Sequence, residues 1–121
     1  MNIRPRINRW TTSRRDLIFS PDIKSSLVQP HFVVSGEGVS EAIQSMPGIF
    51  RQSVDVLCQT IEHDMALGIK SHMLFAVVDS HDKDSTASKA SNSDMPLQVA
   101  VAKLKQQFGA EIVIMTDVCL C

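Results

Sequence analysis

The sequence predicts an α/β protein in which three strands alternate with two helices. Two observations predict this class: three short apolar runs have the composition of buried strands, and two segments between them carry apolar residues at helical spacing. Because crossover connections within one sheet are right-handed and usually helical, the three strands are expected to form a parallel sheet with both helices outside it. A chain of 121 residues has the size of one domain.

Residues 1–26 are predicted to form an N-terminal arm rather than part of the core. Their apolar residues are isolated, and polar residues and prolines interrupt any regular period. All charged residues before Asp16 are arginines. This composition also suits an organelle transit peptide, but Pro5 and the Thr11-Thr12 pair disfavour the amphipathic helix that such a peptide forms.

The first strand is predicted within residues 27–34, the sequence LVQPHFVV. Pro30 is expected to confine regular pairing mostly to the last four of these residues, because proline cannot donate a ladder hydrogen bond. Further along, Pro47-Gly48 predicts a type II turn, in which proline fixes φ at the second position and glycine supplies positive φ at the third.

The first helix is predicted over residues 53–68, with Ser53 as its N-cap and Gly68 as its C-terminal stop. Cys58 falls on the apolar face of this helix and is therefore expected in the core. Three polar residues near the end of the helix are expected to lie mostly toward water: Glu62, His63 and Asp64.

The second strand is predicted at residues 72–78, a continuous apolar run that suits a strand covered on both faces. The polar residues 79–94 are too many for a plain connection, and they form either a solvated loop or a lid. The second helix is predicted over residues 96–109, with a proline in its first turn and a glycine at its end. Residues 111–118 form the third predicted strand.

The end of the third strand carries the strongest candidate site. Side chains at alternate strand positions point the same way, so Asp117, Cys119 and Cys121 share one face if the extended backbone continues. That face lies at the carboxyl end of a parallel strand, where α/β folds place their ligands. A carboxylate and two thiolates could hold Zn²⁺, with His81 as a further candidate ligand. Alternatively, the cysteines are small apolar residues of a core.

Other side chains carry weaker signals. None of the six lysines lies at the carboxyl end of a predicted strand, so none is a good Schiff-base candidate. His31, His63 and His72 are scattered over different elements, which favours ordinary surface or core roles.

Charge and cysteine usage exclude several classes of partner and location. A formal net charge of −1 gives no electrostatic reason to bind nucleic acid or an anionic membrane surface. No apolar run approaches the roughly 20 residues that span a bilayer. Three cysteines without framework spacing indicate a reducing compartment, so a cytoplasmic location is predicted.

Five motifs, in order along the chain, resemble those of the porphobilinogen synthase family, also called delta-aminolevulinic acid dehydratase. The motifs are RPR at Arg4–Arg6, LVQPHFV at Leu27–Val33, SMPGI at Ser45–Ile49, KDSTASKA at Lys83–Ala90 and DVCLC at Asp117–Cys121. The resemblance runs from the arm to the last residue. His31, Ala87 and Gly109 depart from it, because the family prefers an aliphatic residue, a glycine and a proline at these positions.

The resemblance implies a fold and an assembly. Residues 27–121 would be the first three strands and two helices of a (β/α)₈ TIM barrel, incomplete in this chain, and residues 1–26 an arm that wraps a neighbouring subunit in a homo-octamer. Eight strand-helix units need roughly 320 residues, so this chain is expected to be an amino-terminal fragment.

The resemblance also implies an activity, the condensation of two 5-aminolevulinate molecules to porphobilinogen with loss of water in tetrapyrrole and heme biosynthesis. Cys119 and Cys121 would bind zinc together with a third cysteine beyond this chain, and Asp117 would support catalysis in the same pocket. Magnesium is a further candidate metal of the full-length protein. The two Schiff-base lysines would come from later strands, so this chain alone is expected to be inactive.

Two other classes of function remain as alternatives. One is a small non-enzymatic α/β module that binds metal or a partner. The other is a redox protein that uses the thiol pair, which is disfavoured because C-x-C lacks the helix N-terminus that usually activates such thiols.

Overall fold

A five-stranded sheet in the order β2-β3-β1-β4-β5 organises the protein. The structure is a computed structural model, and it describes residues 6–118. The strands are β1 (Val28–Val33), β2 (Ser40–Ala42), β3 (Phe50–Gln52), β4 (Ser71–Ala76) and β5 (Val113–Thr116). The parallel neighbours β1, β4 and β5 confirm the three predicted strands. The sequence did not predict the hairpin of β2 and β3, which extends the sheet because β3 runs parallel to β1.

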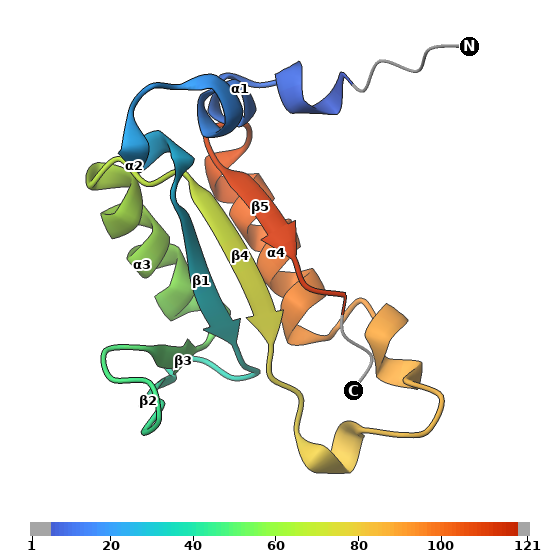
Figure 1. Ribbon diagram of the computed structural model, residues 1–121. Coiled ribbons are helices and arrows are strands. Elements are labelled where there is room, and N and C mark those ends of the chain that lie inside the picture. The colour runs from blue at the N-terminus through green and yellow to red at the C-terminus, as the bar shows by residue number, and fades with distance from the viewer. Residues whose placement is uncertain (1–5, 119–121) are drawn as a thin grey trace.

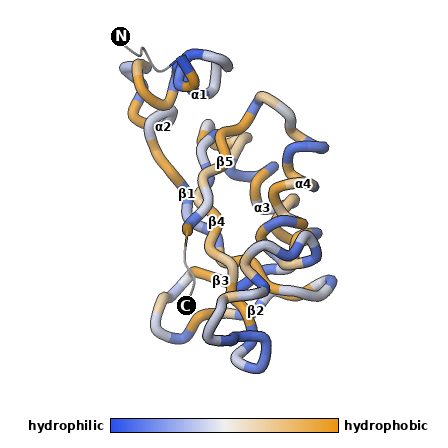
Figure 2. The backbone as a smooth tube through the Cα atoms, turned by 90° about the vertical axis from the view of Figure 1, so that its right-hand side faces the viewer, coloured by the Kyte–Doolittle hydropathy of each residue, from blue (hydrophilic) through white to orange (hydrophobic). Residues whose placement is uncertain are grey.

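Two helices cover one face of the sheet, α3 (Val54–Ala66) and α4 (Pro96–Phe108), and Figure 2 shows both on the same side of the strands. Both predicted helices are thus confirmed, and glycines with positive φ follow them, Gly68 at +95° and Gly109 at +54°. The core between helices and sheet is apolar and includes Cys58, as predicted. Its buried members are Val33, Leu57, Cys58, Ile61, Leu74, Ala100, Leu104 and Ile112.

The opposite face of the sheet also carries large apolar side chains. The rings of Phe32 on β1 and Phe75 on β4 stack there, with centroids 5.5 Å apart. Both rings remain partly exposed, and within residues 6–118 no helix covers this face (Figure 2). The sheet therefore has the two-sided apolar character that a barrel wall has.

The arm contains helices that the sequence did not predict: η1 (Ile7–Arg9), α1 (Thr12–Phe19) and α2 (Ile23–Ser26). A polar cap starts α1, because the hydroxyl of Thr11 accepts a hydrogen bond from the backbone N–H of Arg14 at 3.3 Å. Periodicity could not identify α1, since the helix buries only Ser13. It lies at the amino ends of the strands in Figure 1.

Pairing of β1 extends further than the sequence predicted. All residues from Val28 to Val33 pair with β4, including Pro30 opposite Met73. Proline is tolerated here because alternate residues of β1 direct their N–H groups to opposite neighbours. The N–H of Val34 donates to Gln52 on the β3 side. Pro30 faces that same side, where pairing begins only at Phe32, so its missing donor leaves no gap in the ladder.

The prediction that Asp64 lies toward water is wrong. Glu62 and His63 are exposed, but the side chain of Asp64 is only 14% exposed. Asp64 follows Leu57 and Ile61 at helical spacing, and both of these residues are fully buried. The same spacing therefore turns Asp64 toward the sheet.

No helix within residues 6–118 combines the length and the apolar character needed to cross a membrane.

Candidate functional site

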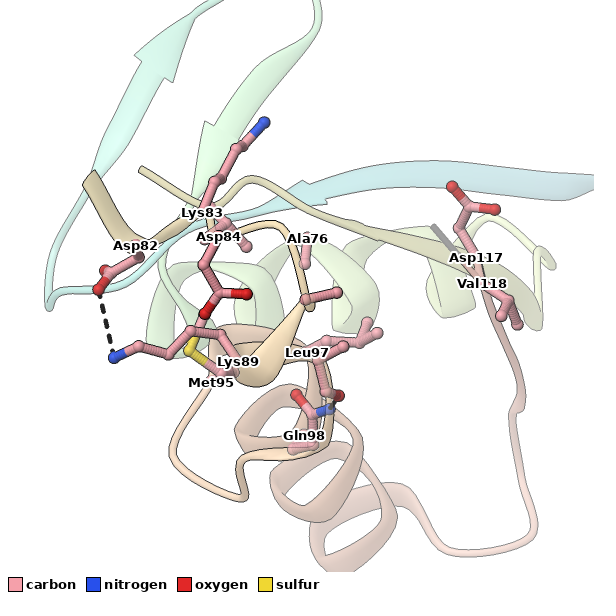
Figure 3. A pocket seen from close by; sticks show the side chains of 13 residues that line it. Ala76, Asp82, Lys83, Asp84, Lys89, Met95, Leu97, Gln98, Asp117 and Val118 are labelled. Carbon is pink, nitrogen blue, oxygen red and sulfur yellow. Dashed lines mark hydrogen bonds and ion pairs between the residues drawn. The ribbon is translucent and has the colours of Figure 1, made fainter. Parts of the chain in front are cut away.

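A cavity of about 260 Å³ lies where β4 and β5 end. In Figure 3, Asp117 and Val118 stand on one side of it and the residues of the β4–α4 loop on the other, with Ala76 and Leu97 between them. A second hollow of about 300 Å³ shares Asp117, Lys83 and Leu97 with it and reaches the rings of Phe32 and Phe75. The site therefore occupies the carboxyl edge of the parallel strands, where such folds bind ligands.

Asp117 faces the open side of the sheet. Its backbone N–H donates to the carbonyl of Leu74 at 3.2 Å, so the pairing with β4 continues one residue beyond β5. Ile112 and Ile114 pack on the core under the helices. Because strand side chains alternate, Asp117 points to the other face, toward Phe32 and Phe75.

Asp84 organises the loop opposite Asp117. Its Oδ1 atom accepts hydrogen bonds from the backbone N–H and hydroxyl of Thr86, both at 2.8 Å, and from the N–H of Ser88 at 3.1 Å. Its Oδ2 atom accepts a short hydrogen bond from the Ser88 hydroxyl. These bonds, the one from the Ser88 hydroxyl first, hold the pKa of Asp84 well below its usual value. The loop is thus built around an ionised carboxylate.

Ala87 adopts the left-handed conformation within this loop, with φ +51° and ψ +41°. Within residues 6–118, Ala87 is the one residue other than glycine that has a positive φ. The resemblance found in the sequence implies glycine at this position, and glycine reaches this conformation without a Cβ clash. The chain therefore keeps the backbone path of a glycine turn at some cost in strain.

Lys83 and Lys89 also line the cavity. Lys89 forms an ion pair with Asp82, with Nζ 3.2 Å from Oδ1 (Figure 3). Sequence reasoning assigned both lysines only to the loop. It missed that the two short 3₁₀ turns of this loop, Ser80–Asp82 and Ser88–Ser91, fold it over the strand ends. The alternative of a lid for residues 79–94 was the signal that could have found them.

The predicted site residues are only partly brought together. Asp117 lies at the cavity, as expected. His81 is not among the residues that line it: its side chain is 77% exposed, with Nε2 3.5 Å from a carboxylate oxygen of Asp82. The predicted metal ligands Cys119 and Cys121 lie outside the described residues.

Comparison with known proteins identifies the fold. The family model described as delta-aminolevulinic acid dehydratase matches residues 2–121. The chain belongs to the delta-aminolevulinic acid dehydratase family. Delta-aminolevulinic acid dehydratase of Chlamydia pneumoniae is 34% identical over 118 residues, which cover 97% of this chain and 35% of that protein. The Schizosaccharomyces pombe protein of the same name is 35% identical over 117 residues, 97% of this chain and 33% of its own length.

A solved structure agrees with the family assignment. The crystal structure of the Toxoplasma gondii delta-aminolevulinic acid dehydratase (porphobilinogen synthase), in complex with the reaction product porphobilinogen, superposes with a TM-score of 0.76 and 36% identity. The superposition covers 99% of this chain and 34% of that one. The chain thus spans about a third of the length of each of these three proteins, and its mixed α/β sheet corresponds to part of a TIM barrel.

Proposed function

We propose that this chain supplies the arm and the first three barrel strands of a porphobilinogen synthase, which condenses two 5-aminolevulinate molecules to porphobilinogen with loss of water. The family match over residues 2–121 supports the reaction class. The observation that carries the proposal is the position of Asp117, at the carboxyl edge of β5 and on the face that a barrel encloses. Tetrapyrrole biosynthesis would be its metabolic setting.

The charges around the cavity suit this substrate. 5-Aminolevulinate has an amine at one end and a carboxylate at the other. Asp117 can accept hydrogen bonds from an ammonium group, and Lys83 can donate them to a carboxylate. Both side chains line the same two hollows. Phe32 and Phe75 add apolar surface to the second hollow, so these residues would bind and orient the substrate rather than form bonds with it.

Zinc is the proposed metal, held by Cys119 and Cys121. Asp117, which still pairs with β4, precedes Cys119 by two residues in the sequence. If the extended backbone continues beyond Asp117, strand alternation would put all three side chains on one face. Thiolates are ligands that select zinc over magnesium. When bound, zinc would supply Lewis-acid polarisation of a substrate carbonyl. Magnesium remains a further proposed metal of the complete enzyme.

A homo-octamer in the cytoplasm is proposed as the state in which this segment works. The arm supports the assembly, because its large apolar side chains are exposed, Trp10 at 71%, Phe19 at 61% and Ile23 at 76%. Such side chains would be buried if the arm wrapped a neighbouring subunit. The mass of the assembled protein in solution tests this part of the proposal.

The alternative of a small non-enzymatic module is less well supported. A self-contained module should cover both faces of its sheet, whereas the stacked Phe32 and Phe75 lie on the face away from the helices. Purification of the 121-residue chain separates the two ideas. A monodisperse monomer with cooperative unfolding would favour the module, and self-association through apolar surface would favour the barrel segment.

The activity can be tested in a chimera in which this chain replaces the matched 118 residues of the Chlamydia pneumoniae relative. Porphobilinogen formation is expected in the chimera but not in the 121-residue chain alone. Asp117→Ala and Cys119→Ser should each lower turnover by at least tenfold, because one removes a substrate contact and the other a metal ligand. Cys58→Ala is the matched control, since Cys58 is a buried core thiol away from the cavity.

A further inference from the structure

Three ionisable side chains meet beneath α3, away from the cavity described above. His31 comes from β1, His72 from β4 and Asp64 from the last turns of α3. His31 Nε2 lies 3.1 Å from His72 Nδ1 and 3.5 Å from Asp64 Oδ2, and His72 Nδ1 lies 4.0 Å from the same oxygen. Three potential ligand atoms from three separate elements therefore surround one point.

The environment of these side chains is nearly dry. The side chain of His72 is fully buried, that of His31 is 4% exposed and that of Asp64 is 14% exposed. Burial lowers the pKa of each histidine to about 4, and for His72 the charge of His31 adds to the effect. Both imidazoles are thus neutral at pH 7, the form in which histidine binds metals.

Within the described residues, the hydrogen bonds of this cluster leave a carboxylate oxygen of Asp64 without a donor. A neutral histidine pair at 3.1 Å shares one N–H between its facing nitrogens, so that proton is not available to Asp64. Asp64 Oδ2 is buried and has no hydrogen-bond partner among the described residues. Burial also raises the pKa of Asp64. A buried carboxylate oxygen without a donor is costly, and a cation at this point would satisfy it.

We propose that His31, Asp64 and His72 form a second metal site that binds Zn²⁺ between the sheet and α3. In a tetrahedral site with bonds of 2.0–2.1 Å, neighbouring ligand atoms are about 3.3 Å apart. The observed separations of 3.1, 3.5 and 4.0 Å bracket this value. Asp64 is the most exposed of the three, so a water molecule can complete the coordination from its side.

The ligand set determines which metal fits. Two imidazoles and one carboxylate suit Zn²⁺ and similar transition metals, whereas magnesium and calcium prefer oxygen ligands. The site also differs in place and ligand type from the proposed cysteine site. His72 is the second residue of β4, near its amino end, whereas Asp117 lies beyond the carboxyl end of β5. A metal here would join β1, β4 and α3.

Zinc titration calorimetry at pH 7 on the full 121-residue chain tests the proposal. The parent for this experiment carries Cys119→Ser and Cys121→Ser, which removes the thiol pair as a competing site. One Zn²⁺ per chain is expected. His31→Leu and Asp64→Asn should each weaken binding by at least tenfold, because each removes one ligand.

Two matched controls locate the site. His63→Ala removes an exposed histidine next to Asp64 on the same helix, and His81→Ala removes the histidine of the exposed group with Asp79 and Asp82. Both should bind Zn²⁺ as the parent does. Loss of binding in His81→Ala with retention in His31→Leu would overturn the proposal, as would a parent that binds no Zn²⁺.

Thermal unfolding keeps the result interpretable if a variant folds poorly. Zn²⁺ should raise the melting temperature of the parent and of His63→Ala but not that of His31→Leu, which replaces a buried polar group with an aliphatic one and is expected to fold. Co²⁺ serves as a spectroscopic probe. Absorption typical of nitrogen and oxygen ligands supports the site, and a thiolate charge-transfer band in the parent would contradict it.

Discussion

The hydroxyl of Ser13 donates a hydrogen bond to the backbone carbonyl of Ala110 at 2.7 Å. Ser13 is 4% exposed, and it joins the arm to the segment between α4 and β5, 97 residues away in the chain. The arm is thus attached to the body of its own chain at this point.

Replacement of Ser13 by alanine should weaken that attachment. Loss of the bond is expected to lower the free energy of unfolding by about 1 kcal/mol, because the Ala110 carbonyl loses its buried donor. Chemical denaturation measures the change, and limited proteolysis should cut the arm faster. Ser20→Ala is the control, since among residues 6–118 the hydrogen bond of the Ser20 hydroxyl is a local one, accepted from the N–H of Asp22. Equal stability of the two variants would contradict the account.

Asp55 ties the start of α3 to the loop before β2. Its Oδ2 atom accepts from the N–H of Gly38 at 2.9 Å, and its Oδ1 atom accepts from the Ser53 hydroxyl at 2.5 Å. These bonds, the Ser53 bond first, lower the pKa of Asp55. Because the pKa of Asp55 is lower in the folded protein than the 3.8 of the unfolded chain, ionised Asp55 stabilises the fold above pH 3.8. This stabilisation is lost as the pH falls through the folded-state pKa.

The variant Asp55→Ala should therefore be less stable than the parent at pH 7 but lose less stability on acidification below pH 3.8. Denaturation midpoints measured from pH 7 to pH 2 check both expectations. Glu37→Ala, which removes an exposed carboxylate from the same loop, should follow the parent. If both variants gave the same pH profile, the contacts of Asp55 would carry no stability.

The buried histidine pair predicts a second pH dependence, measured with a chelator so that no metal is bound. The pKa of His31 and of His72 falls from 6.5 in the unfolded chain to about 4 in the folded one, so the unfolded chain binds more protons between these values. The free energy of unfolding should therefore show no loss from the histidines above pH 6.5. It should fall between pH 6.5 and pH 4 by up to about 1.4 kcal/mol per pH unit for each histidine.

His31→Leu should make that decline shallower, because one of the two titrating groups is gone. Asp64 has the opposite effect on the free energy of unfolding. Because its pKa is raised in the folded protein, ionising it as the pH rises above 3.8 destabilises the fold. Measurements between pH 5 and 7 are therefore the most informative. A slope in His31→Leu equal to that of the parent would show that the histidines are not buried as described.

Ala87→Gly is expected to stabilise the protein. Alanine at φ +51° is destabilised by roughly 1–2 kcal/mol in the left-handed conformation, and glycine avoids this cost. The greater flexibility of glycine in the unfolded chain offsets about 1 kcal/mol of that gain. A net increase of up to about 1 kcal/mol in the free energy of unfolding should follow. Ala90→Gly, in the adjoining 3₁₀ turn, lacks the strain and should be neutral or destabilising. Destabilisation by Ala87→Gly would contradict the left-handed assignment.

The sequence predicted the elements that have a strong period or a clear boundary. Residues 54–66 and 96–108 have an apolar face and end at glycines, and the Pro47-Gly48 turn forms with φ of +82° at Gly48. The short strands β2 and β3 escaped prediction, because three mostly exposed residues show no alternation to detect. The arm helix α1 escaped because its register shows no apolar face.

Only part of the candidate site was predicted, because several of its residues lie in segments without a periodic pattern. Asp117 could be placed from strand alternation alone. The approach of Lys83 and Lys89 depends on the folded path of the loop, which carries no periodic signal. The cluster of His31, Asp64 and His72 depends on contacts between three elements, and each residue alone looks ordinary. Only the helical spacing of Asp64 from Ile61 was available as a sequence signal.

If this chain forms part of a porphobilinogen synthase barrel, it should support catalysis once the rest of the barrel is supplied. The most direct test is the rate of porphobilinogen formation from 5-aminolevulinate by the chimera with the Chlamydia pneumoniae relative, compared with its Asp117→Ala variant. Turnover is expected in the chimera, with at least a tenfold loss in the variant. A folded chimera that forms no porphobilinogen, or a variant as active as the chimera, would contradict it.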